Sequence, residues 1–331
     1  MTTSIHSRLL ITALSLSTIL GLAACAPADT AAAPPAEPTS NPVSVVSDES
    51  TVVHFDLASG QLPENITDGA DGGVLLSFAA SRQIARVSPE GETTIIATLP
   101  TSKDASASTP VLGFPLSTGL VRDGEVIYAL LATGAPDTTG VWKIDGDAAP
   151  EMIAKLPSTG LPNGLALDAQ SQTLYIADSV GGVIFTVPTS GGEATVWSDG
   201  DELNSTGFLG VNGVKLKDGA LYASNLDQGT VLRIPVRDDG SAGDSHVVAR
   251  DVVGIDDFDF TGNGDEIVAT INPESEVVLI QADGTHAVVL SDDQGLSNPT
   301  SALVMDGTLY VPSAAYVTQE DPNLIITSIN F

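Results

Sequence analysis

A four-strand pattern that returns six times along the chain places the strongest constraint on the fold. Its third copy shows every strand, separated by turns that contain Gly or Asp: GLALDA, TLYIADS, VIFTVPTSGG and EATVWSD, between Gly164 and Asp199. The strands are rich in β-branched residues and alternate between apolar and polar positions, and no long helical period appears. Repeats of roughly 40–50 residues with four strands each are typical of β-propeller blades.

The sixth copy indicates how the ring of blades closes. It contains SALVMD, GTLYVPSAA and LIITSINF and stops at Phe331, so that its fourth strand is missing. A spare strand, TVVHFDL (Thr51 to Leu57), precedes the first copy. If this strand completes the last blade, the blade has no open sheet edge that invites aggregation. The sequence therefore predicts an all-β fold, a six-bladed β-propeller over residues 51–331 closed by an N-terminal strand.

The first 24 residues are predicted to be a lipoprotein signal peptide. Arg8 is followed by an apolar stretch from Leu9 to Leu22, and Leu-Ala-Ala-Cys ends at Cys25. Such a stretch is typical of the apolar region of an export signal, because a membrane span needs roughly 20 residues. The ending resembles the bacterial lipobox, whose cysteine is lipid-modified; a plain secretory peptide is the alternative. Cys25 is the only cysteine, so no intramolecular disulfide can form.

Residues 25–50 are predicted to form a flexible tether that follows the lipidated cysteine. The segment is rich in Pro, Ala and Ser and has no aromatic residue, so it cannot bury enough apolar surface to offset its ordering entropy. We therefore expect an extracytoplasmic protein that is lipid-anchored to the cell membrane or the outer membrane.

The charge of the chain limits the classes of partner. It carries 42 Asp and Glu against 12 Lys and Arg, a formal charge of −30, and removal of the signal with Arg8 gives −31 (−30 − 1). Nucleic acid is excluded as a partner, because its recognition depends on cationic contacts to phosphate. Polyanionic substrates are disfavoured and cations are favoured. We expect a monomer that contacts the membrane through its lipid anchor only.

Oxygen-bearing side chains are predicted to form a ring at one mouth of the central channel. Residues just before the first strand of each blade should lie there, and counting back from the Leu-Tyr of the second strand locates them. In chain order the positions are Glu64, Leu116 or Ser117, Asn163, Asn212, Asp256 and Asn298. Turn formation is one explanation for these residues. It explains the acids Glu64 and Asp256 poorly, because unpaired carboxylates are costly to bury.

A bound cation would remove that cost. The candidate ligands Glu64, Asn163, Asn212 and Asp256 are all carboxylates or amides, without His or Cys. Hard oxygen ligands favour Ca²⁺ or Mg²⁺, and an irregular ring favours Ca²⁺ over the strict octahedral geometry of Mg²⁺.

The stretches PNGLALD…LYIADS and NGVKLKDGALYASN resemble those of the gluconolactonase and senescence-marker-protein (regucalcin) propellers. The order Glu, Asn, Asn, Asp is also similar to that of paraoxonases and diisopropylfluorophosphatase. The resemblance implies Ca²⁺-dependent hydrolysis of lactones or phosphotriesters. It also implies that Glu64, Asn163, Asn212 and Asp256 are the metal ligands and that the metal polarises the ester or lactone oxygen. Asp256 would then serve as the base or nucleophile. A histidine relay is not expected. The three histidines outside the predicted signal peptide, His54, His246 and His286, fall on outer or closing strands.

Two functions remain open from the sequence. The first is a membrane-tethered, Ca²⁺-dependent hydrolase that acts on small lactones or related esters. The alternative is a non-catalytic propeller at the cell surface that binds a ligand or partner and holds a structural Ca²⁺. Propellers host many functions, so the fold does not separate the two.

Overall fold

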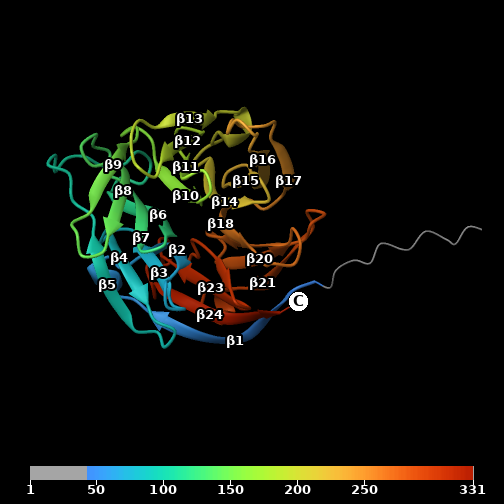
Figure 1. The fold of residues 1–331 in the computed structure, drawn as a ribbon. Helices are drawn as coiled ribbons and strands as arrows, with labels where there is room; N and C mark the ends of the chain where they lie inside the picture. Colours follow the sequence, from blue (N-terminus) through green and yellow to red (C-terminus); the bar gives the residue numbers. More distant parts are fainter. Residues whose placement is uncertain (1–42, 331) are drawn as a thin grey trace, which may run out of the picture. The chain divides into compact units, whose positions relative to one another are not determined.

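Six antiparallel sheets of four strands each make up the part of the chain that the structure describes, residues 43–330 of a computed structural model (Figure 1). The predicted signal peptide (1–24), the lipidation site Cys25 and most of the predicted tether lie outside the described residues. Helical residues between 43 and 330 are confined to three short 3-10 turns, Leu57–Ser59, Asp201–Leu203 and Asp292–Gln294. No helix in this range is long and apolar enough to cross a membrane.

The strands follow the predicted repeats in order, with the innermost strand first in each blade. Blade 1 contains β2 (Pro63–Asp68), β3 (Val74–Phe78), β4 (Gln83–Val87) and β5 (Thr93–Thr98). Blade 2 contains β6 (Leu116–Asp123), β7 (Val126–Ala132), β8 (Gly140–Asp145) and β9 (Glu151–Lys155). Blade 3 contains β10 (Pro162–Asp168), β11 (Thr173–Asp178), β12 (Val183–Pro188) and β13 (Thr195–Ser198). Blade 4 contains β14 (Val211–Lys217), β15 (Ala220–Asn225), β16 (Thr230–Pro235) and β17 (His246–Ala249). Blade 5 contains β18 (Ile255–Phe260), β19 (Ile267–Ile271), β20 (Glu276–Ile280) and β21 (His286–Leu290).

Blade 6 is closed by the N-terminal strand, as predicted. It contains β22 (Leu303–Met305), β23 (Thr308–Ser313), β24 (Asn323–Asn330) and, as its outer strand, β1 (Val45–His54). The closing strand differs from the predicted Thr51–Leu57: it begins within the segment assigned to the tether and ends at His54. Its pairing with β24 shifts register between Val46 and Ser50, and such a bulge interrupts the alternation from which strand bounds are predicted.

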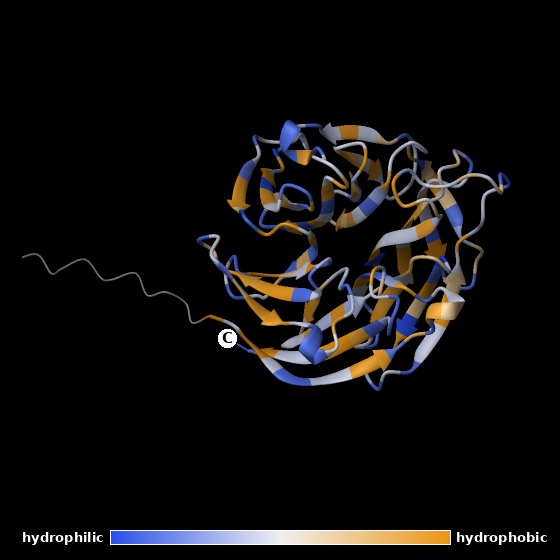
Figure 2. Ribbon diagram, turned by 180° about the vertical axis from the view of Figure 1, so that it is seen from behind, coloured by the Kyte–Doolittle hydropathy of each residue, from blue (hydrophilic) through white to orange (hydrophobic). Residues whose placement is uncertain are grey.

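The hydrophobic core is divided among the six interfaces between consecutive blades. Each interface holds one cluster of buried apolar side chains, including that between blades 6 and 1. Between blades 4 and 5, for example, Tyr222 meets Phe260 edge-on with 4.9 Å between the ring centroids. Figure 2 shows the corresponding pattern, with apolar residues recurring along the strands of every blade. Each blade is therefore stabilised by both of its neighbours.

The inner strands of consecutive blades lie close together around the channel, and β22 and β2 complete the circle. Glycines permit this approach. A Cβ atom on Gly164 would lie 2.2 Å from the carbonyl oxygen of Asn212, and one on Gly213 would lie 2.1 Å from Oδ1 of Asp257. The Asn-Gly pairs at 163–164 and 212–213 therefore lie inside strands β10 and β14, not in turns, and their glycines are needed for blade packing.

Candidate functional site

The four predicted metal ligands occupy equivalent positions in blades 1, 3, 4 and 5. Each follows the first residue of its inner strand, where the register with the second strand shifts. A bulge of this kind re-aims side chains, and bulges are common beside active sites. The exposed fractions are 7% for Glu64, 8% for Asn163, 2% for Asn212 and 8% for Asp256. The sequence therefore located these residues correctly in four blades, although it placed them before the strands.

The predicted positions in blades 2 and 6 were wrong. In blade 2 the bulge falls on Thr118 and Gly119, after Leu116 and Ser117, which still pair with β7. In blade 6, Pro299 bridges Ser313, so Thr300 is the equivalent residue. The predicted positions lie 11 or 12 residues before the tyrosine of the second strand, Tyr128 or Tyr310. In blades 2 and 6 the first two strands are joined by a two-residue turn, so the equivalent residue lies 10 residues before that tyrosine, as Asn212 does in blade 4.

The two threonines hold the blades together and complete the ring without adding charge. Thr118 Oγ1 donates to the carbonyl oxygen of Pro162 at 2.8 Å, and Thr300 Oγ1 donates to that of Pro63 at 2.9 Å. Asn298, which the sequence placed in the ring, instead accepts hydrogen bonds at Oδ1 from the backbone N–H groups of Val317 and Thr318. Its amide oxygen is thus used to hold a loop.

Glu64 and Asp256 form the charged part of the ring. Burial raises the pKa of Glu64 to about 7, although a hydrogen bond from Tyr316 opposes the rise and the nearby Asp257 adds to it. Burial also raises the pKa of Asp256 well above its usual value, and the negative charges of Glu64 and Asp257 raise it further. Neither Glu64 nor Asp256 forms an ion pair with a cationic side chain between residues 43 and 330.

The two amides of the ring are held differently. Asn212 Nδ2 donates to Asp256 Oδ1 at 2.8 Å, which fixes the orientation of both side chains. The side chain of Asn163 forms no hydrogen bond with any residue of the described range, although it is more than nine-tenths buried. Asn163 is not among the fully enclosed polar side chains that lack a partner, so its amide keeps contact with solvent, where a water or a ligand can bind it.

A second polar layer lies next to the ring, and the sequence analysis missed most of it. The carboxylate of Asp257, only 4% exposed, accepts hydrogen bonds at Oδ2 from Lys215 Nζ (2.8 Å), Asn65 Nδ2 (3.0 Å) and Ser301 Oγ (2.7 Å). These residues come from blades 5, 4, 1 and 6, so the cluster joins the blades across the channel. The sequence contained one signal for it, a lysine within the inner strand GVKLKDG.

Apolar side chains surround the ring on its outer side. Leu62, Leu161 and Leu209 precede the inner strands, and Phe114, Val180, Leu226 and Tyr316 lie in neighbouring loops; all belong to one cluster. Further out, the exposed apolar residues of the loops before and between the strands at this mouth are Val111, Phe208, Val253 and Val317. We call the cluster and these four residues the apolar collar.

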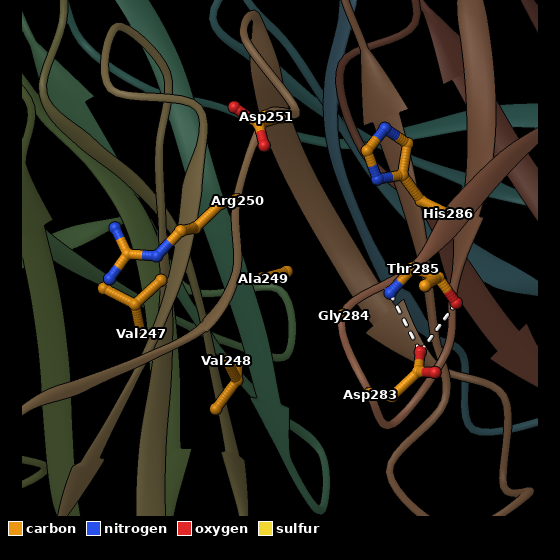
Figure 3. Close-up of a pocket in the computed structure, with 9 residues that line it drawn as sticks. All are labelled: Val247, Val248, Ala249, Arg250, Asp251, Asp283, Gly284, Thr285 and His286. Carbon is orange, nitrogen blue, oxygen red and sulfur yellow. Dashed lines mark hydrogen bonds between the residues drawn. The ribbon is translucent and has the colours of Figure 1, made fainter. Parts of the chain in front are cut away.

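Two cavities lie away from the ring. One of about 350 Å³ occupies the other end of the channel and is lined by the later halves of the inner strands, with Lys215 and Asp259 among its polar residues. The other, about 570 Å³, lies at the outer rim between β17 and the turn before β21 (Figure 3). There Asp283 accepts hydrogen bonds from the backbone N–H and the hydroxyl of Thr285, which stabilise that turn. Neither cavity contains a ring residue.

The residues of the ring fit a hard divalent cation. Two carboxylates would balance its charge, and amide oxygens are ligands that Ca²⁺ accepts. The raised pKa of both carboxyl groups reflects a cost of burial that a cation would relieve. Between residues 43 and 330, no cluster of three or more His, Cys, Asp or Glu side chains is arranged to hold a metal. A cation at the ring would have to be held by the amides as well as by the two carboxylates.

Comparisons with known proteins define the class of fold. No protein-family model matches the chain, and no curated protein sequence matches it. Among solved structures, the chain is similar to a luciferin-regenerating enzyme, with 11% identity and a TM-score of 0.61 over 85% of this chain and 95% of that one. It is similar to a calcium-binding protein, regucalcin, from Agrobacterium tumefaciens, with 17% identity and a TM-score of 0.60 over 83% and 94%.

Two further propellers broaden that comparison. A virginiamycin B lyase from Staphylococcus aureus has 14% identity and a TM-score of 0.52 over 85% of this chain and 99% of that one. A nidogen/laminin complex has 17% identity and a TM-score of 0.55 over 78% and 97%. All of these identities are low, so the likeness shows the propeller fold alone. The resemblance to the regucalcin propellers is therefore supported at the level of fold.

Proposed function

We propose that the protein is an extracytoplasmic, lipid-anchored, Ca²⁺-dependent hydrolase of lactones or related esters that acts as a monomer. One observation carries the proposal: two carboxylates that repel each other, Glu64 and Asp256, are buried at a channel mouth without a cationic partner among the described residues. Such an arrangement is stable when a bound cation compensates the charge. The calcium-binding regucalcin among the structural neighbours supports the same choice of metal.

Glu64, Asn163, Asn212 and Asp256 would hold the cation, and Mg²⁺ is a second candidate for the same oxygen ligands. When bound, the metal acts as a Lewis acid that polarises the carbonyl oxygen of a lactone or ester. The hydrogen bond from Asn212 to Oδ1 of Asp256 fixes the plane of that carboxylate. The other oxygen of Asp256 is then placed to take a proton from water as a general base, or to attack the carbonyl carbon as a nucleophile.

The surroundings of the ring favour a neutral substrate with an apolar body. The apolar collar offers contact surface and excludes water. Acids greatly outnumber bases in the chain as a whole, which repels anionic substrates. We therefore expect neutral lactones with alkyl or aryl substituents to be better substrates than sugar acids or phosphorylated compounds.

A panel of lactones and aryl esters tests the proposal. Turnover should require Ca²⁺, disappear with a chelator and return when Ca²⁺ is restored. Asp256→Asn should abolish turnover, and a substitution at the outer rim, His286→Gln, serves as the matched control that keeps full activity. Absence of turnover on every substrate, despite tight Ca²⁺ binding, would contradict the hydrolase.

That outcome would favour the second candidate, a propeller that binds a partner and uses Ca²⁺ structurally. The exposed members of the apolar collar favour this alternative, because Val111, Phe208, Val253 and Val317 present apolar surface on loops around one mouth. A propeller in the nidogen/laminin complex shows that related folds occur in protein assemblies.

A further inference from the structure

Tyr316 is the one aromatic side chain that reaches the polar ring with a hydrogen-bonding group in the described part of the chain. Its hydroxyl donates to Oε2 of Glu64 at 2.5 Å, and its ring packs beside that of Phe114 at 6.5 Å between centroids. The residue lies outside the repeated strands, in the loop between β23 and β24. It therefore connects the apolar collar to the candidate metal ligands.

The loop that carries Tyr316 is held in place from the neighbouring turn. Asn298 Oδ1 accepts from the N–H groups of Val317 and Thr318, at 2.9 and 3.0 Å. Ser297 Oγ lies 2.6 Å from the hydroxyl of Thr318. The backbone adopts left-handed φ angles at Ala315 (57°) and Gln319 (53°), which non-glycine residues rarely do. Unfavourable backbone of this kind persists where the surroundings enforce it, often at functional sites.

The contact with Glu64 selects one carboxylate oxygen. Because Tyr316 donates to Oε2, the other oxygen, Oε1, remains available on the same carboxyl group. Hydrogen bonds from neighbouring groups orient metal-binding carboxylates in this way, and their loss typically weakens metal binding by about 10–100-fold.

We infer that Tyr316 is a positioning residue of the metal site, which orients Glu64 by binding Oε2 so that Oε1 faces the cation. The inference rests on the proposed function, in which Glu64 is a metal ligand. It assigns a role to a residue outside the four ligands. It also gives Asn298 a role other than that of a ligand, because its side chain holds the loop that carries Tyr316.

The substitution Tyr316→Phe tests the role with little change in packing, since Phe keeps the contact with Phe114 and loses only the hydroxyl. Calorimetric titration of Ca²⁺ should show affinity weakened by about 10–100-fold. In a Glu64→Ala background, which removes the acceptor of the Tyr316 hydroxyl, the same substitution should change affinity by no more than about 2-fold, because its effect acts through the Glu64 side chain. Equal effects in both backgrounds would overturn the inference. Tyr310→Phe, a buried tyrosine in the same blade, is the matched control.

A spectroscopic readout separates positioning from a merely structural role. Tb³⁺ binds hard oxygen ligands as Ca²⁺ does, and it luminesces strongly when a nearby tyrosine absorbs light. Excitation of wild type and Tyr310→Phe should therefore give Tb³⁺ emission that Ca²⁺ displaces, and Tyr316→Phe should lose most of it. Undiminished emission and unchanged Ca²⁺ affinity in Tyr316→Phe would refute the positioning role while leaving the metal site intact. Absence of Ca²⁺ and Tb³⁺ binding to the wild type would overturn the metal site itself.

Discussion

The stability of the metal-free propeller should fall as the pH rises from 5 to 8, because of Glu64. Burial raises the pKa of this carboxyl group from 4.5 in the unfolded chain to about 7 in the folded protein. Between these values the folded state holds a proton that the unfolded state has released. Stability is therefore complete below about pH 4.5 and is lost as the pH rises through 7.

The size of the effect follows from the shift of 2.5 pKa units (7 − 4.5). At 1.36 kcal/mol for each unit, the loss is about 3 kcal/mol between pH 4.5 and pH 8. Asp256 changes stability in the same direction. Burial raises the pKa of Asp259 to about 6, so its contribution to stability is lost at a lower pH than that of Glu64. Acids whose pKa is lowered, such as Asp227, act in the opposite direction but below pH 4.

Calcium should reverse the loss, since it binds the deprotonated carboxylates. At 100 times its dissociation constant, a ligand stabilises the folded state by about 2.7 kcal/mol. Urea unfolding of the apo and Ca²⁺-loaded protein, followed at several pH values between 5 and 8.5, measures both effects. The two curves should coincide near pH 5 and separate above pH 7.

Glu64→Gln is the control that isolates the contribution of this residue. Its apo stability should vary by about 3 kcal/mol less over the same pH range than that of the wild type, because Gln does not titrate. An apo wild type whose stability is constant or rises from pH 5 to 8, or a Glu64→Gln variant with the same pH profile as wild type, would refute the reasoning.

Three further predictions concern the second polar layer, the closure of the ring and the anchor. Lys215→Met should destabilise the fold by about 3–5 kcal/mol in urea unfolding, because it leaves the buried Asp257 carboxylate without its cation; a loss below about 1 kcal/mol would contradict the role of the pair. Deletion of residues 45–54 should lower the thermal unfolding temperature and promote aggregation by exposing the edge of β24, whereas deletion of 26–41 should not; equal stability of both truncations would contradict the closure. Cys25→Ser should release the protein from membranes after a salt wash, so a variant that still sediments with membranes would exclude the lipid anchor.

The sequence predicted the fold because every blade repeats one alternation of apolar and polar residues. It located the ring residues in blades 1, 3, 4 and 5. It failed in blades 2 and 6, because it allowed for a two-residue turn only in blade 4, and the same turn moves the position to Thr118 and Thr300. The length of the blade 6 hairpin could be predicted from the sequence, because Asp306-Gly307 is typical of a two-residue turn.

Other features carried no local signal. Tyr316 lies in the loop between the second and third strands of blade 6, which is longer than the corresponding loop of the other blades, so no repeat predicts where its side chain points. The start of β1 was missed because the polar run 47–50 interrupts the alternation where the strand bulges, and only pairing with β24, about 280 residues away, makes this segment a strand. Long-range pairing of this kind is a property of the closed ring and cannot be read from a short window.

The direction of β1 determines where the N-terminal segment joins the propeller. Val45 pairs with Asn330, and His54 pairs with Asn323, which lies at the same end of blade 6 as the ring. The chain thus enters the propeller at the end of the channel remote from Glu64. Whatever is attached to the chain before Val45 therefore joins the fold on the side away from the ring, so that it and a ligand at the ring would approach the propeller from opposite ends.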